Sequence, residues 1–107
     1  MTEITATRNG QHYCLEAHNH AATTEVCAGV SALLYALEGS LFNCDGVICH
    51  YSRMVSGEAK IEYIATDPEA KACMHVVLIG LMQIEKAHPD EIKISQNFFE
   101  TMHLGED

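Results

Sequence analysis

The sequence predicts an α/β protein of the α+β type, in which one mixed sheet is packed with two helices. Three observations favour this fold: two pairs of alternating apolar and polar stretches joined by tight turns, two apolar stripes at helical spacing, and one short apolar segment near the end. The predicted order is β-β-α-β-β-α-β. Because 107 residues can bury one two-layer core but not two, we expect a single domain over residues 1–107.

A hairpin opens the chain. Residues 2–7 alternate in polarity, and the Asn9-Gly10 pair predicts a tight type I′ turn. The second strand then runs from Gln11 to about His18. Alternation places two sets of side chains on opposite faces, Tyr13, Leu15 and Ala17 on one and His12, Cys14, Glu16 and His18 on the other. If this strand continued, His18 and His20 would project to the same side.

The first helix follows a short polar link. Thr23-Thr24 offers an N-cap, and a Thr24 cap would make Cys27 the third helical position. Gly39 is a natural C-terminal stop, and residues 40–46 then form a loop. The apolar stripe of this helix consists of Val26, Cys27, Val30, Leu33, Leu34 and Leu37.

The second half repeats the pattern. Residues 47–55 and 58–65 read as a hairpin with Ser56-Gly57 at its turn, and Asp67-Pro68 begins the second helix. The predicted stripe of this helix is Cys73, Val76, Val77, Gly80, Leu81 and Ile84. His88-Pro89 ends it, and a strand over residues 92–95 closes the sheet. We expect the last residues to fray or form a turn, with the acidic tail 105–107 solvated.

The charge balance narrows the choice of partners. Six basic and fifteen acidic residues give a net charge of -9, which argues against direct binding of nucleic acid through phosphate contacts. A basic protein partner would suit this charge, although solubility alone also accounts for it.

The cysteine pattern and the N-terminus indicate a cytoplasmic protein. Five cysteines without a C-x-x-C pair make a disulfide framework or a zinc knuckle a poor fit. The first residues contain neither a basic start nor an apolar run of signal-peptide length, and we expect no segment to approach a membrane span. Scattered free thiols are typical of a reducing compartment.

His20 and Cys27, seven residues apart, are the candidate catalytic pair. A helix N-terminus and a nearby imidazolium both favour a thiolate, which is the nucleophilic form of cysteine. If the two side chains meet, His20 would take the thiol proton and Cys27 would attack an amide or ester carbonyl. Backbone N–H groups of the first helical turn would then hold the oxyanion. The alternative is that Cys27 is a small core residue.

These residue types also fit two other kinds of chemistry, metal binding and redox chemistry. His18 and His20 could ligate a metal with Cys27 or Cys14, but one short segment lacks the usual second ligand pair, so we expect no metal and no cofactor. A redox role would need a resolving cysteine near Cys27. Ser31 shares a helix face with Cys27 and could tune the thiol or simply pack. No third member of a triad can be identified from the sequence.

Two runs carry a resemblance to a known family. H-A followed by V-C-A-G-V-S-A-L-L resembles the signature of the ribosomal-processing cysteine proteases (Prp), in which Gly-His-Ala precedes Asp-Ile-Val-Cys-Ala-Ala-Val-Ser-Ala-Leu. The run D-P-E-A-K-A-C-M-H-V-V-L-I-G-L-M-Q-I-E-K-A-H-P-D-E-I-K-I is similar to the second helix and final strand of that family. The likeness covers nearly the whole chain in the same element order.

The resemblance implies a homodimeric cysteine endopeptidase with His20 and Cys27 as its dyad, and with Ser31 and Ala28 as possible supporting residues. Family members remove the N-terminal extension of a large-subunit ribosomal protein, and phage relatives are thought to process virion proteins. A non-catalytic dimeric module that binds peptides is the alternative function.

This sequence departs from the family pattern at three places. Asn19 replaces the glycine before the histidine, T-T-E replaces the aspartate before Val-Cys, and the link between His20 and Cys27 is several residues shorter. If the shorter link shifted the register by one strand pair, His18 would replace His20 as the base.

Overall fold

The computed structural model describes residues 1–100 and Leu104, and it confirms the predicted α+β order. The described residues form a mixed five-stranded sheet in the order β3-β4-β2-β1-β5. Only the β1–β5 pair is parallel within this sheet. The elements are β1 (Thr2–Asn9), β2 (His12–His18), α1 (Thr24–Phe42), β3 (Val47–Val55), β4 (Glu58–Ala65), α2 (Pro68–Ala87) and β5 (Ile92–Gln96).

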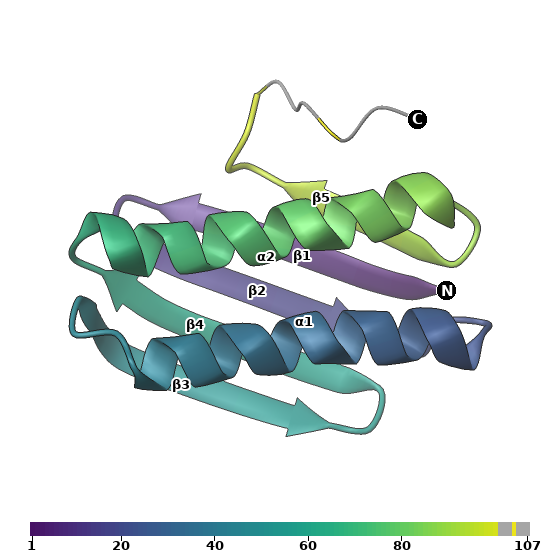
Figure 1. Cartoon of the computed structure of the whole chain (residues 1–107), viewed down its shortest axis with the longest axis horizontal. Helices are drawn as coiled ribbons and strands as arrows, with labels where there is room; N and C mark the ends of the chain where they lie inside the picture. Colours follow the sequence, from purple (N-terminus) through teal and green to yellow (C-terminus); the bar gives the residue numbers. More distant parts are fainter. Residues whose placement is uncertain (101–103, 105–107) are drawn as a thin grey trace.

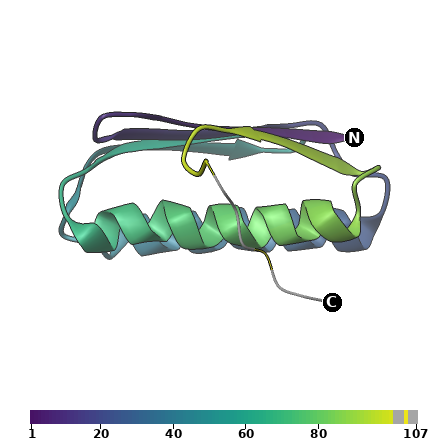
Figure 2. The ribbon, with the colours of Figure 1, turned by 90° about the horizontal axis from the view of Figure 1, so that it is seen from above.

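Both helices lie side by side over one face of the sheet (Figures 1 and 2). The core fills the space between the two layers, and its largest fully buried side chains include Tyr13, Tyr63 and Leu37. The other sheet face carries the polar side chains of the alternating strands, as the pattern of β2 predicts. There Lys60 approaches Glu16 at 3.7 Å and His12 approaches Glu62 at 3.4 Å.

The first turn differs from the predicted type I′. Asn9 pairs with His12, so the two central residues are Gly10 and Gln11 rather than Asn9 and Gly10. Of these two, only Gly10 has a positive φ, of 62°. A positive φ at the first central position alone is the pattern of a type II′ turn, in which glycine takes that position.

Helix α1 begins and ends differently from the prediction. Thr23 is the N-cap, and its side chain accepts the Val26 N–H, which makes Cys27 the fourth helical position. The predicted stop at Gly39 is wrong, because the helix continues to Phe42 and buries Leu41 as the next residue of its stripe. Asn43 caps the end by donating its side-chain N–H to the Gly39 carbonyl at 2.8 Å.

Helix α2 starts as predicted, with Asp67 accepting the Ala70 N–H at 2.8 Å and Pro68 in the first turn. Its buried stripe is Ala70, Met74, Val77, Leu78 and Leu81. The prediction that Val76 belongs to this stripe is wrong, since 69% of Val76 is exposed. Met74, two residues before Val76, is buried in the core instead, so the stripe is rotated relative to the predicted one.

The expectation that no segment approaches a membrane span does not hold for α1. This 19-residue helix is long and apolar enough to cross a membrane, by length and composition alone. Core helices pass the same test, and α1 packs its stripe of Val26, Val30, Leu34, Leu37 and Leu41 in the core.

After β5 the chain turns back onto the sheet. Phe98 is buried and meets the ring of Tyr13 edge-on, with 5.0 Å between the ring centroids. The side chain of Gln96 holds this turn by accepting the N–H groups of Phe98 and Phe99. The predictions for residues 105–107 lie outside the described residues.

Candidate active site

The chain reverses direction at Asn19, immediately after β2 ends at His18. Asn19 has a φ of 72°, in the left-handed region that asparagine tolerates better than most residues. Its N–H donates to the Gly57 carbonyl at 2.8 Å, which fixes the bend against the β3–β4 turn. The strand therefore does not continue to His20, and the two histidines do not project together as a continued strand would require.

His18 and His20 occupy different environments. His18 lies at a position paired with Glu58 of β4, and its Nδ1 approaches the Glu58 carboxylate at 3.6 Å. His20 lines the same pocket as Cys27, described below, whereas His18 does not line it.

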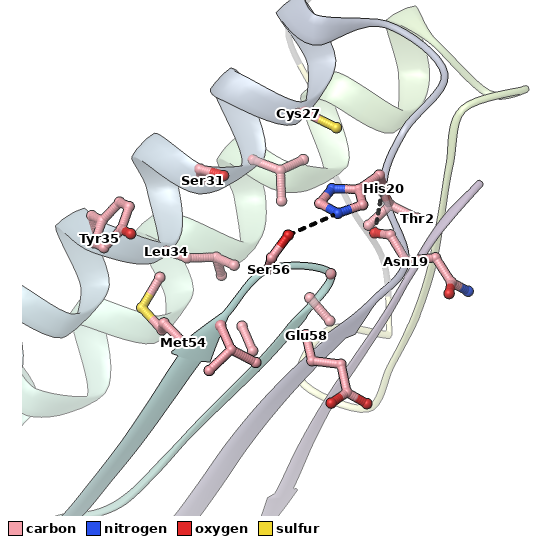
Figure 3. A pocket seen from close by; sticks show the side chains of 15 residues that line it. Thr2, Asn19, His20, Cys27, Ser31, Leu34, Tyr35, Met54, Ser56 and Glu58 are labelled. Atoms are coloured by element: carbon pink, nitrogen blue, oxygen red, sulfur yellow. Dashed lines mark hydrogen bonds between the residues drawn. The ribbon is translucent and has the colours of Figure 1, made fainter.

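The β3–β4 turn supplies a partner for His20. The Ser56 hydroxyl lies 3.3 Å from His20 Nε2, within hydrogen-bond distance (Figure 3). The sequence predicts that Ser56 lies in a turn, but it does not predict the contact with His20. That contact forms because β4 pairs with β2, which brings the β3–β4 turn next to the end of β2.

Cys27 projects from the first turn of α1, and its sulfur lies close to the backbone of Ala21. The Ala21 N–H donates to Sγ at 3.0 Å, and the thiol lies 3.6 Å from the Ala21 carbonyl oxygen. The Cys27 N–H is already bonded to the Thr23 carbonyl at 3.2 Å, so it does not provide the oxyanion donor expected from the first helical turn.

His20 and Cys27 line one pocket of about 230 Å³ between α1, the β3–β4 turn and the end of β2 (Figure 3). Its polar side chains include Ser31 and Ser56. Its apolar wall comes from both layers and includes Val30, Leu34, Tyr35, Met54 and Val55. Within the described part of the chain no hydrogen bond joins His20 to Cys27, since their bonds go to Ser56 and Ala21 respectively. A thiol and an imidazole therefore share a pocket of mixed polar and apolar lining, with room for part of a peptide.

Comparison with known proteins identifies the family. The family model of the cysteine protease Prp matches residues 1–93. The chain belongs to the cysteine protease Prp family. No match was found among curated proteins.

Three solved structures from Staphylococcus aureus have the same fold. One is an essential ribosomal processing protease Prp in complex with a covalently linked product peptide, with a TM-score of 0.78 and 21% identity. A second is that protease in complex with a substrate peptide, with a TM-score of 0.73 and 18% identity. A third is a hypothetical protein, with a TM-score of 0.71 and 18% identity. In each comparison the match covers 91% of this chain and 100% of the other.

The structure accounts for one departure from the Prp pattern. The pattern has glycine before the histidine, and Asn19 holds that position here in a left-handed conformation. After glycine, asparagine is among the residues that adopt this conformation most readily. The replacement is therefore compatible with the bend that takes the chain from β2 into the pocket.

The remaining predicted positions of this Prp-family chain separate into two groups. Ser31 lines the pocket one helical turn after Cys27, whereas Ala28 is exposed and does not line it. The acidic residues Glu16 and Glu25 do not line it either. Among the described residues no three His, Cys, Asp or Glu side chains gather as a metal site.

Proposed function

We propose that this Prp-family chain is a cysteine endopeptidase that cleaves a peptide held in the pocket between α1 and the β3–β4 hairpin. The observation that carries the proposal is that His20 and Cys27, from different elements, line the same pocket. Family membership supports the reaction class, and the apolar wall suits a hydrophobic peptide segment.

The reaction follows from the two side chains. His20 takes the proton of Cys27, and the sulfur attacks the scissile carbonyl to form a tetrahedral intermediate. This intermediate expels the amine, which takes the proton from His20, and leaves a thioester on Cys27. Water then gives a proton to His20 and attacks the thioester, releasing the carboxylic acid and restoring the thiol. Ser56, bonded to Nε2, would hold the ring orientation during these transfers.

For the substrate, we propose the N-terminal extension of a large-subunit ribosomal protein, or of a related virion protein. The net charge of -9 suits a basic partner of the ribosomal kind. The S. aureus protease has been solved with substrate and product peptides, which supports a peptide in the equivalent pocket. We further propose a cytoplasmic homodimer, to be checked by sedimentation equilibrium.

The test incubates the purified protein with peptides that span the N-terminal extension of the ribosomal protein, or of a capsid protein, and identifies cuts by mass spectrometry. We expect one cut with the wild type and none with Cys27→Ala. Cys49→Ala is the matched control, because Cys49 is exposed and does not line the pocket. His20→Ala should abolish cleavage and His18→Ala should not; the reverse result would transfer the base role to His18.

A second candidate, a peptide-binding module without activity, is favoured by the absence of a hydrogen bond between His20 and Cys27 in the described residues. Dyads in enzymes without substrate are often loose, so this geometry does not exclude catalysis. Saturable binding of the same peptides by wild-type protein, with no cut after prolonged incubation, would establish the binding module and reject the peptidase.

A further inference from the structure

Two buried polar residues hold the segment from Asn19 to Thr23, which leads from the end of β2 to the start of α1. In the described part of the chain the buried polar or charged residues are Thr2 and Glu91, which are 4% and 7% exposed. Thr2 bonds to Asn19, and Glu91 bonds to Thr23. Burying a polar group costs free energy unless the group is hydrogen-bonded. We therefore ask which hydrogen bonds Thr2 and Glu91 make beside the candidate dyad.

Glu91 lies between α2 and β5 and holds the C-terminal end of the link. Its Oε1 accepts the Thr23 N–H at 2.7 Å and the Thr23 hydroxyl at 2.9 Å. Its Oε2 lies 3.4 Å from His88 Nδ1. One carboxylate therefore fixes both the backbone and the side chain of the N-cap residue of α1.

Thr2 holds the other end. The Thr2 hydroxyl donates to the Asn19 carbonyl at 3.1 Å, and the Thr2 N–H donates to the Glu91 carbonyl at 2.9 Å. The bend before His20 and the helix start before Cys27 are thus connected through β1 and Glu91. Burial raises the pKa of Glu91, but the bonds from Thr23 and Ala22 and the neighbouring His88 outweigh it and lower that pKa overall. The carboxylate is charged at neutral pH.

The residue between these ends that touches the sulfur is Ala21, whose N–H donates to Cys27 Sγ at 3.0 Å. Ala21 is two residues from Thr23, so its orientation depends on how firmly Thr23 is held. A hydrogen bond donated to sulfur favours the anionic form of the thiol, which is the nucleophile.

We propose that Glu91 is a positioning residue that fixes the His20–Cys27 link so that the Ala21 N–H stays on the Cys27 sulfur. The effect on sulfur reactivity follows from the contacts themselves, whereas the effect on turnover rests on the proposed peptidase function. In this chain a buried carboxylate that bonds to Thr23 would hold the short link in one position.

The experiment measures alkylation of Cys27 by iodoacetamide from pH 5 to 10, with peptide mass spectrometry to separate it from the other cysteines. Glu91→Ala should slow alkylation of Cys27 at pH 7 by about fivefold, because the sulfur loses the hydrogen bond that the Ala21 N–H donates to it. Glu91→Gln keeps an oxygen that can accept from Thr23, so it should recover most of the rate, to within about twofold of wild type.

Glu85→Ala is the matched control. Glu85 lies on α2, and its carboxylate accepts the Ile94 N–H at 2.8 Å, so the substitution removes the same kind of contact away from the link. Its Cys27 profile should equal that of wild type. If Glu85→Ala and Glu91→Ala slow Cys27 alkylation equally, the cause is a general loss of stability and the proposal is overturned. An unchanged alkylation profile in folded Glu91→Ala would also overturn it.

If Glu91→Ala does not fold, hydrogen exchange of the Ala21–Thr23 amides in Thr23→Ala, which removes the side-chain bond to Glu91, decides. Faster exchange together with slower alkylation supports the proposal, and no change in either overturns it.

Peptide cleavage, measured in parallel, separates the positioning role of Glu91 from the proposed peptidase function. We expect Glu91→Ala to lower kcat and leave KM unchanged. No cleavage by wild type, with Glu91-dependent alkylation, would reject the peptidase but not the positioning role.

Discussion

Each of the two helices carries a cysteine near its start, and the two thiols lie in contrasting surroundings. Cys27, in the first turn of α1, lines a pocket and accepts an N–H from the preceding link. Cys73, in the second turn of α2, is half-buried; burial, then the thiol of Cys44 and the carboxylate of Glu69, raise its pKa. A helix start alone does not make a cysteine reactive; what differs is the chain segment that approaches the sulfur.

The largest expected difference between the two cysteines is in catalysis. Cys27→Ala should reduce peptide cleavage by about a thousandfold or more, because loss of a nucleophile removes the covalent route. Cys73→Ala should leave kcat/KM within about twofold of wild type. Steady-state kinetics on the ribosomal-protein peptide checks both, and equal activity of wild type and Cys27→Ala would contradict the dyad.

The next difference concerns reactivity. At pH 7 iodoacetamide should modify Cys27 faster than Cys73, because burial, Cys44 and Glu69 raise the pKa of the Cys73 thiol. Cys73 should need a higher pH than an ordinary thiol to react at the same rate. Equal rates at the two sites would remove the contrast on which the comparison rests.

A smaller effect is expected at Ser56. Ser56→Ala removes the hydroxyl that lies 3.3 Å from His20 Nε2 and should lower kcat by about fivefold, because one neutral hydrogen bond contributes about 1 kcal/mol. Ser40→Ala is the matched control, since Ser40 is exposed on α1 and does not line the pocket. Alkylation of Cys27 at high pH should be unaffected, and a change there would place Ser56 in a different role.

The N-caps of the two helices should differ in their effect on Cys27 but not in their effect on stability. Thr23→Ala and Asp67→Ala should each cost about 1 kcal/mol of the free energy of unfolding, because each removes an N-cap acceptor. Only Thr23→Ala should also slow Cys27 alkylation, since Thr23 connects Glu91 to the link. Urea denaturation and the alkylation assay separate the two effects; slowing by Asp67→Ala would contradict a local origin.

The smallest effect is on acid stability. The pKa of Glu91 is lowered on folding, so its carboxylate stabilises the fold above its unfolded pKa, and this stabilisation is lost as the pH falls through the folded value. Wild type should therefore lose more thermal stability than Glu91→Gln when the pH falls below about 4.5. Melting temperatures from pH 7 to 3 test this, and parallel curves would contradict it.

The sequence predicted most of the fold because the relevant signals are local. Alternation, capping residues and helical periodicity placed every described helix and strand, whereas the errors occurred where tertiary contacts decide. Helix α1 continues past Gly39 because Leu41 is buried in the core on the next turn. The register of β1 with β2 moves the first turn by one residue.

The candidate site was predictable only in part. His20 and Cys27 are close in sequence, so a short link places both at one end of the sheet. Ser56 and Glu91 come from distant segments, and they reach the site through the pairing of β4 with β2 and of β5 with β1. No periodicity or motif in the sequence encodes these contacts, because strand order is set by packing of the whole sheet.

The left-handed conformation of Asn19 has a consequence for how mutations at this end of the sheet will be read. One backbone torsion angle gives two histidines, only two residues apart, different surroundings. His18 belongs to the solvent-facing charge pattern and His20 to the pocket. A β-branched residue at position 19 would oppose that torsion, so it could impair the base without altering any side chain in the pocket. An apparently surface substitution would then look like an active-site mutation.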